Sequence, residues 1–228
     1  MALALFGYQL ASGQACYGGS CYGGSGAPSN ELGVRIGGLT NSSTDGGFYS
    51  AEHAQHLGFF GGAHYKRYQR VGAIRTAIGI THYDIEKNLD CPDCIRTDGE
   101  VNQVKVRLGY EWFTFFGPVE PYAGIDAVAA FGKYEGETFT YGETGSDFWQ
   151  YTEVRNKRGF GFAPVVGFRF YLGSYASIGA ETTFEAMMYN RKTLVSDLNV
   201  ERTTINMQRN YWETTFHPVS WLSLNVLF

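Results

Sequence analysis

A ten-residue segment from Gln103 to Trp112 sets out the hydrophobic pattern that most of the later chain repeats. It reads QVKVRLGYEW, so every second position from Val104 to Trp112 is apolar or aromatic, and the positions between them are polar, charged or glycine. Side chains of a β-strand point alternately to opposite faces. This period of two therefore predicts a strand with one apolar face and one charged face.

Seven other segments show the same alternation and complete a set of eight predicted strands. We expect a bulge or irregularity in the last of them, because Pro218 has no amide donor for a strand ladder. No run of 18 consecutive apolar residues occurs, so the sequence predicts no helical membrane span. The predicted strands cover residues 31–40, 57–68, 71–83, 103–112, 121–131, 159–171, 177–189 and 211–228.

The connections between these strands alternate in length. Short turns are expected near residues 67–70, 116–119 and 172–175, and long polar loops at residues 41–54, 84–99, 133–158 and 190–209. Consecutive antiparallel strands reverse direction, so the turns should lie at one end of the sheet and the loops at the other. An even number of strands with short turns and long outer loops is the plan of bacterial outer-membrane barrels, and it places both termini in the periplasm.

The residues on the two faces indicate which face meets which solvent. Between Gly159 and Tyr171 one phase is rich in Phe, and the other is mainly Gly, Ala and a single Arg. Small residues with isolated charges suit a narrow lumen, whereas rows of Phe suit contact with lipid tails. We therefore predict an all-β, eight-stranded antiparallel up-and-down transmembrane β-barrel, with a soluble, lipocalin-like barrel as the alternative.

Length, composition and charge further restrict the class of protein and its expected partners. The 228 residues fit one domain, and 30 Gly, 16 Tyr and 17 Phe suit strands and tight turns. The formal net charge of -4 provides no basic surface, so nucleic acid is not an expected partner. We expect no cofactor and no metal.

The N-terminal region divides into two parts ahead of the barrel at residues 31–228. Residues 1–15 read MALALFGYQLASGQA, which is similar to the rear of a secretory signal peptide without its basic start. We expect a truncated signal peptide, whose start site is placed too far downstream, and the alternative is a merely apolar N-terminus. A lipoprotein attachment at Cys16 is disfavoured because the preceding residues lack the usual Leu. Residues 16–30, rich in Gly and Ser, form a periplasmic lead-in.

Four cysteines pair by proximity, Cys16 with Cys21 and Cys91 with Cys94. An even number of cysteines in an exported chain favours disulfides. The CPDC motif also fits a redox motif or half of a zinc site, but polar turn residues flank it and no further ligand has a recognisable spacing. We expect a disulfide at the tip of a loop.

The inward phase of the predicted strands collects charged residues. Buried charges are costly unless they are paired, and an eight-stranded barrel has just enough room for its own side chains. We therefore expect a salt-bridged plug, with a narrow ion path as the alternative. The expected charge network comprises Arg35, Lys66, Arg75, Lys105, Arg107, Glu111, Asp126, Arg169, Glu181 and Glu185.

The chain resembles the small eight-stranded outer-membrane barrels, such as the OmpA transmembrane domain and OmpX, over residues 31–228. Members of that family end on an aromatic residue, and this chain ends WLSLNVLF. Its GAHYKRY and VRLGYEW segments look most like the small barrels of Bacteroidetes. The resemblance implies a Gram-negative outer membrane, with lipid, lipopolysaccharide and the barrel-assembly machinery as partners. It also implies an assembly signal at Leu222, Leu224, Val226 and Phe228.

The third predicted loop is the candidate binding region. Exposed aromatic residues often mark a binding surface. We expect a structural or binding subunit that meets another protein or a glycan, possessing no enzymatic activity. The alternative is an enzyme acting on lipid A, with His53, His56, His82, Ser146 and Asp147 near the outer rim. The candidate binding residues are Phe139, Tyr141, Phe148, Trp149 and Tyr151.

Overall fold

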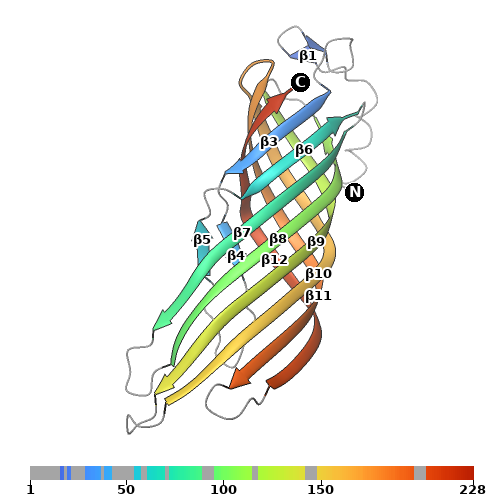
Figure 1. Cartoon of the computed structure of the whole chain (residues 1–228). Helices are drawn as coiled ribbons and strands as arrows, with labels where there is room; N and C mark the ends of the chain where they lie inside the picture. The colour runs from blue at the N-terminus through green and yellow to red at the C-terminus, as the bar shows by residue number, and fades with distance from the viewer. Residues whose placement is uncertain are drawn as a thin grey trace.

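Eight antiparallel strands close into one barrel in the computed structural model of the chain (Figure 1). The structure describes residues 16–17, 20–21, 29–36, 39–42, 54–57, 61–69, 72–88, 95–114, 118–141, 148–197 and 204–228. This part of the chain contains no helix, and therefore none that could cross a membrane. The barrel strands are β3 (Asn30–Ile36), β6 (Gly62–Tyr68), β7 (Ala73–Asn88), β8 (Ile95–Phe113), β9 (Val119–Tyr141), β10 (Phe148–Tyr171), β11 (Ala176–Asp197) and β12 (Thr204–Leu227).

Each barrel strand pairs with its neighbours in the chain, and the first and last strands close the ring. β12 pairs with β3 from Leu222 to Leu227, opposite Ile36 to Glu31. β3 pairs in turn with β6, and the remaining pairs are consecutive hairpins. The predicted eight-stranded antiparallel up-and-down barrel is confirmed.

The short turns lie at one end of the barrel. They connect β6 to β7, β8 to β9 and β10 to β11, as the sequence predicts. Phe228 lies at the same end, because its amide donates to the Asn30 carbonyl at 3.0 Å and its own carbonyl accepts from the Asn30 amide at 2.9 Å. The C-terminus is therefore fixed beside the first residue of β3.

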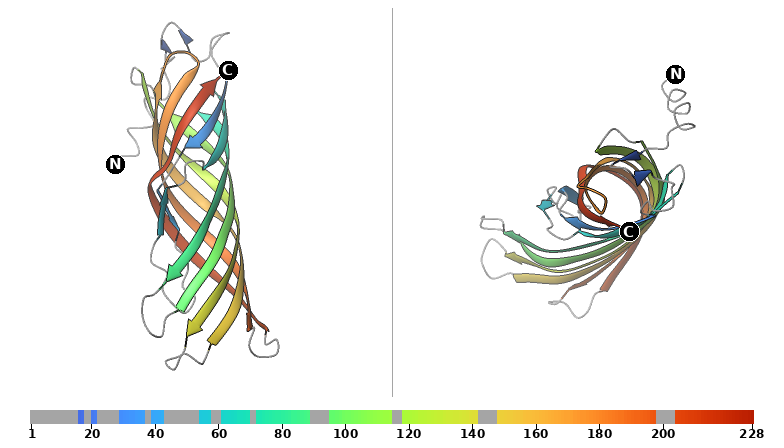
Figure 2. Two further views of the ribbon diagram at one scale, coloured as in Figure 1. Left: turned by 60° about the vertical axis from the view of Figure 1, so that its left-hand side comes forward. Right: turned by 90° about the horizontal axis from the view of Figure 1, so that it is seen from above.

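The strands differ greatly in length, which gives the barrel two unlike halves. β3 and β6 have 7 residues each, whereas β7 to β12 have 16 to 24. Figure 2 shows the consequence: a closed ring at the end that holds the C-terminus, and long strands that sweep past it as a curved sheet. This curved sheet, beyond the level where β3 ends and β6 begins, is called the extension below.

The prediction of long outer loops is wrong for much of their length, because strands of the extension occupy these residues. Residues 133–158 are not one loop, because β9 runs to Tyr141 and β10 begins at Phe148. Strands also occupy much of residues 84–99 and 190–209. The prediction failed because the strands continue where the apolar alternation stops: the outward positions there are polar, so the period of two is no longer visible as a hydrophobic pattern.

Two predicted strands are shorter than expected. β3 ends at Ile36 rather than at residue 40, and β6 begins at Gly62 rather than at residue 57. The residues between them include β4 (Leu39–Ser42) and β5 (Ala54–Leu57), which form a separate two-stranded sheet. Gly62 has a φ of +140° and its Cα faces the Ile78 carbonyl closely, which explains why a glycine begins β6.

The last strand contains the predicted irregularity at Pro218. Glu181 of β11 is the partner of Trp221, whereas Thr183, two residues later, is the partner of His217. β12 therefore carries extra residues at this point, which is a β-bulge. Pro218 and Val219 both point outward there, and Ser220 and Trp221 both point inward.

Candidate functional site

The inward side chains of the ring form one continuous network of ion pairs. All ten charged residues predicted for the lumen lie inside the barrel, and all except Lys105 are at least nine-tenths buried. They come from seven of the eight strands, because each strand contributes alternate residues to the interior. Two further carboxylates, Glu31 and Glu120, are fully buried among them.

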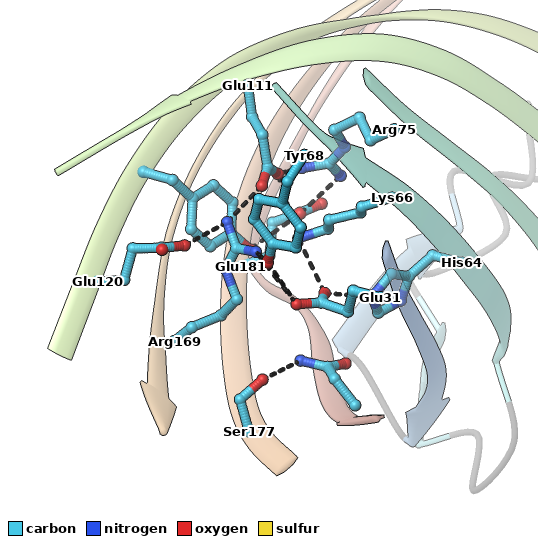
Figure 3. A network of polar contacts seen from close by, with 12 residues as sticks. Glu31, His64, Lys66, Tyr68, Arg75, Glu111, Glu120, Arg169, Ser177 and Glu181 are labelled. Carbon is cyan, nitrogen blue, oxygen red and sulfur yellow. Dashed lines mark hydrogen bonds and ion pairs between the residues drawn. The ribbon is translucent and has the colours of Figure 1, made fainter. Parts of the chain in front are cut away.

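Arg169 is the centre of the network at the end with the short turns (Figure 3). Its guanidinium lies 3.2 Å from Glu31 and 2.6 Å from Glu120, and it also pairs with Glu111. Lys66 reaches two of the same carboxylates, at 3.4 Å from Glu31 and 3.1 Å from Glu111. Two cations thus hold three acids in a space closed to solvent.

Arg75 connects this group to the rest of the lumen. Its guanidinium lies 3.2 Å from Glu111, 3.1 Å from Asp126 and 2.7 Å from Glu181. These partners come from β8, β9 and β11, so Arg75 on β7 spans the interior. A fully buried guanidinium with three carboxylate partners satisfies the condition under which a buried charge is tolerated.

The outer part of the network centres on Glu185. Lys105 lies 2.7 Å from it, Arg107 pairs with it directly, and the imidazole of His217 lies 3.7 Å away. Arg107 also faces Glu181 at 3.7 Å. This group lies closest to the extension, and Lys105 is its one partly exposed cation, with 21% of its side chain accessible.

Counting both ends, the network is electrically balanced. The six cations are those predicted from the sequence. The four predicted acids become six when Glu31 and Glu120 are added, so six positive charges face six negative ones. Glu31 shares the inward phase of Arg35 and was detectable on that ground. Glu120 lay between the predicted turn at 116–119 and the predicted strand at 121–131, and it was missed.

Aromatic side chains pack around Arg169 and complete the plug. Its guanidinium lies 4.8 Å from the ring centre of Tyr122 and 5.4 Å from that of Tyr68. The ammonium group of Lys66 also lies near Tyr122, 4.8 Å from the same ring centre. The Tyr171 hydroxyl donates to Glu120 at 2.8 Å. Cation–π contacts of this kind are favourable where water is excluded, and the sequence pattern did not single out these tyrosines.

The outward face of the same strands is apolar over a sharply bounded band. On β8 it runs from Trp112 to Val104, and on β10 from Phe170 to Phe160. The outward side chains of these two stretches are exposed, except for the half-buried Tyr110. The outer limit of the band follows the strand register in two steps. Ile80, Val104 and Phe131 are successive partners across β7, β8 and β9. Two residues nearer the short turns, Phe160, Met188 and Trp212 are successive partners across β10, β11 and β12. On six strands the next outward residue is polar: His82, Asn102, Lys133, Arg158, Asn190 and Asn210.

The candidate binding aromatics lie in strands of the extension rather than in a loop. Phe139 and Tyr141 belong to β9, and Phe148, Trp149 and Tyr151 belong to β10. Phe148 is the partner of Tyr141, so these residues flank the end of one hairpin. Phe139 and Tyr151 are half-buried, and the side chains of the other three lie outside the described residues.

The extension also has polar contacts of its own on its inner side. Arg155 pairs with Glu153 and lies 5.2 Å from the ring centre of Tyr134. Burial raises the pKa of the Tyr134 hydroxyl above its ordinary value. Further along, Lys157 bonds Glu213 at 2.7 Å. The concave side of the extension is therefore an ordered, charged and aromatic surface.

The predicted assembly residues Leu222, Leu224, Val226 and Phe228 all point outward and are exposed at the end of the last strand.

Cys16 and Cys21 are partners in the two-stranded sheet of β1 (Cys16–Tyr17) and β2 (Ser20–Cys21). Their side chains lie outside the described residues, as do Cys91 and Cys94 entirely. The predicted disulfides stay predictions.

The residues considered for a lipid A enzyme are not brought together by the described part of the chain. His82 is exposed on β7, with its Nδ1 atom 2.8 Å from Asn102 and 3.5 Å from Glu100. His56 belongs to β5. His53, Ser146 and Asp147 lie outside the described residues.

Comparison of the chain with protein-family models, with curated proteins and with solved structures gives no match. The class that can be stated is therefore the one that the fold defines, an eight-stranded up-and-down β-barrel with an ion-paired interior.

Proposed function

We propose that the chain is an integral outer-membrane β-barrel that is closed to ions and carries a binding sheet outside the bilayer. The apolar outward band carries this proposal. Its nine residues on β8 and eleven on β10 match the 9–11 residues with which a tilted strand crosses a membrane. On six strands the outward residues change to polar ones within two residues of a common register, which supports the edge of a bilayer at this position.

The aromatic residues support the same orientation. Trp112, Tyr175 and Phe228 lie at the end of the band near the short turns, and Phe131 and Trp212 lie near its outer limit. Aromatic girdles at both interfaces are typical of outer-membrane barrels. This orientation places the short turns and the C-terminus in the periplasm and the extension outside the cell.

The interior supports a rigid barrel rather than a pore. Five buried cations and the partly exposed Lys105 are matched by six buried acids, and tyrosine rings fill the space around Arg169. We infer that the protein serves as a structural or binding subunit, whose extension meets another protein or a surface glycan. The family resemblance adds the barrel-assembly machinery as the partner that reads the terminal aromatic residue.

Expression behind an export leader in a Gram-negative host tests the location. We expect the protein in the outer-membrane fraction, migrating faster on gels when unheated than when boiled. A protein found in the soluble periplasm, with no dependence of migration on heating, would contradict the membrane proposal and favour the soluble barrel.

Planar-bilayer recording tests the closed lumen. We expect little or no steady conductance from the purified protein, because ion pairs and tyrosine rings occupy the ring along its length. The porin of the same host, purified in the same detergent, serves as the positive control. Large, regular and ion-selective steps from this chain would mean that the inward charges line water.

A further inference from the structure

Arg35, at the outer end of the lumen network, is a buried cation without an acid. It is 3% exposed, and no described carboxylate lies within 4.0 Å of its guanidinium. Its contact is with an aromatic ring instead, since the guanidinium carbon lies 4.7 Å from the ring centre of Trp221. Every other cation that the sequence predicted for the lumen has at least one carboxylate partner.

Among the described residues of the outer part of the network, both carboxylate oxygens of Asp126 lack a hydrogen-bond partner, and so do three buried nitrogen atoms. The nitrogen atoms are Nε1 of Trp221 itself, Nη1 of Arg107 and Nδ1 of His217. The first two are obligatory donors, and the third is a donor in one neutral tautomer and in the protonated ring. The nearest carboxylate oxygens to Arg107 Nη1, at 3.7 and 3.9 Å, are too distant for a hydrogen bond.

The charge of the network is balanced overall but not along its length. At the end with the turns, Lys66 and Arg169 face three acids, namely Glu31, Glu111 and Glu120. The outer part has an excess of one positive charge when Arg75 is counted with it, and Arg75 also lies 3.2 Å from Glu111 of the other end. It contains the cations Arg35, Arg75, Lys105 and Arg107 and the acids Asp126, Glu181 and Glu185.

This outer part lies at the rim of the closed ring. Arg35 is the last residue but one of β3, and its carbonyl accepts from the amide of Gly61, which directly precedes β6. The ring of Trp221 lies over this rim, where a Cβ on Gly79 would come within 3.4 Å of it. Lys105, partly exposed, faces the extension from the same group. A small solute could therefore approach from the side of the extension.

We propose that the rim beside Trp221 binds a small free oxyanion, a phosphate or a carboxylate, from the outer aqueous side. An oxyanion brings a negative charge to the uncompensated cation of the rim. It also brings several acceptor oxygens to the buried donors there. A neutral water molecule would satisfy a donor but leave the excess charge. Arg35 supplies the main charge, Arg107 and the Trp221 indole add donors, and the wall of the ring separates the site from lipid headgroups.

Isothermal titration calorimetry of the purified protein in detergent, with inorganic phosphate and separately with acetate, tests this site. We expect saturable binding of one anion per chain for at least one of the two. Arg35→Gln and Trp221→Phe should each weaken it about tenfold or more, since each removes a charged or buried hydrogen bond. Trp221→Phe keeps an aromatic ring in place, and Lys133→Gln, which alters an exposed pair, is the matched control.

Stability in the absence of anions provides a second measurement. Removing a buried cation that lacks an acid should not lower stability, so Arg35→Gln should unfold at or above the temperature of the unaltered protein. Absence of binding for both anions, or equal binding by the Arg35→Gln protein, overturns the proposal. So does a fall in unfolding temperature for Arg35→Gln as large as that for Arg169→Gln, because it would show that Arg35 is part of the structural ion pairing.

Discussion

Arg169→Ala is expected to destabilise the protein by about 3–5 kcal/mol, the cost of breaking a buried ion pair by removing one partner. The arginine holds Glu31, Glu111 and Glu120 together at one end of the lumen. Lys66 and Arg75 reach only Glu31 and Glu111, so Glu120 would lose its one cationic partner among the described residues. The free energy of unfolding in urea, for the protein inserted in lipid vesicles, measures the effect.

An exposed ion pair provides the control for this change. Lys133 and Glu135 lie 2.5 Å apart on the outward face of the extension, and both are about half exposed. Exposed pairs contribute about 0–1 kcal/mol, so Lys133→Ala should leave stability almost unchanged. Equal effects of the two substitutions would mean that water reaches Arg169, and the lumen would then not be closed.

Val166→Arg is expected to destabilise the vesicle-inserted protein by about 2–4 kcal/mol, the cost of a cation at the bilayer midplane on the lipid face of a barrel. Val166 is 62% exposed and lies on β10 between Phe160 and Phe170, in the middle of the apolar band. The size of the change separates the two kinds of barrel, since a charged residue at an exposed position of a soluble barrel would have little effect on stability.

Asn156→Arg is the matched control, because Asn156 is an exposed outward residue of the same strand beyond the band. It should leave the free energy of unfolding in vesicles unchanged. A neutral result for Val166→Arg would remove the main support for the membrane proposal. A large effect of Asn156→Arg would place the edge of the bilayer further out than the change to polar residues indicates.

The number of strands, their order and the position of the short turns could be predicted because alternation is a strong local signal. Where one face carries apolar residues, as from Val104 to Trp112, every second residue indicates the strand. Beyond the band the two faces are both polar in many places, so Lys133 to Thr140 reads as a loop although it is paired on both sides. Backbone hydrogen bonds hold these strands together, and they form whatever the side chains are, so the sequence does not reveal them.

The strand alternation predicts which residues belong to the charge network, but it does not predict which of them pair with one another. Alternation places Arg75 and Glu181 on the inner face, yet their contact at 2.7 Å depends on the stagger of strands far apart in the chain. Glu120 was missed because it lies at the boundary of a turn, where the phase is not defined by neighbours. Trp221 lies on the inner face, but its position over the rim depends on the bulge at Pro218.

The extension also affects the entropy of binding. A loop gives up conformational freedom when a partner immobilises it, at about 1–2 kcal/mol per ordered backbone residue. Here seven residues of β12, Thr204 to Asn210, and eleven of β10, Phe148 to Arg158, are already held in a ladder that continues into the ring. That ordering is complete before any encounter, so a partner meets a preorganised surface that stands roughly 25–35 Å along the strands beyond the apolar band.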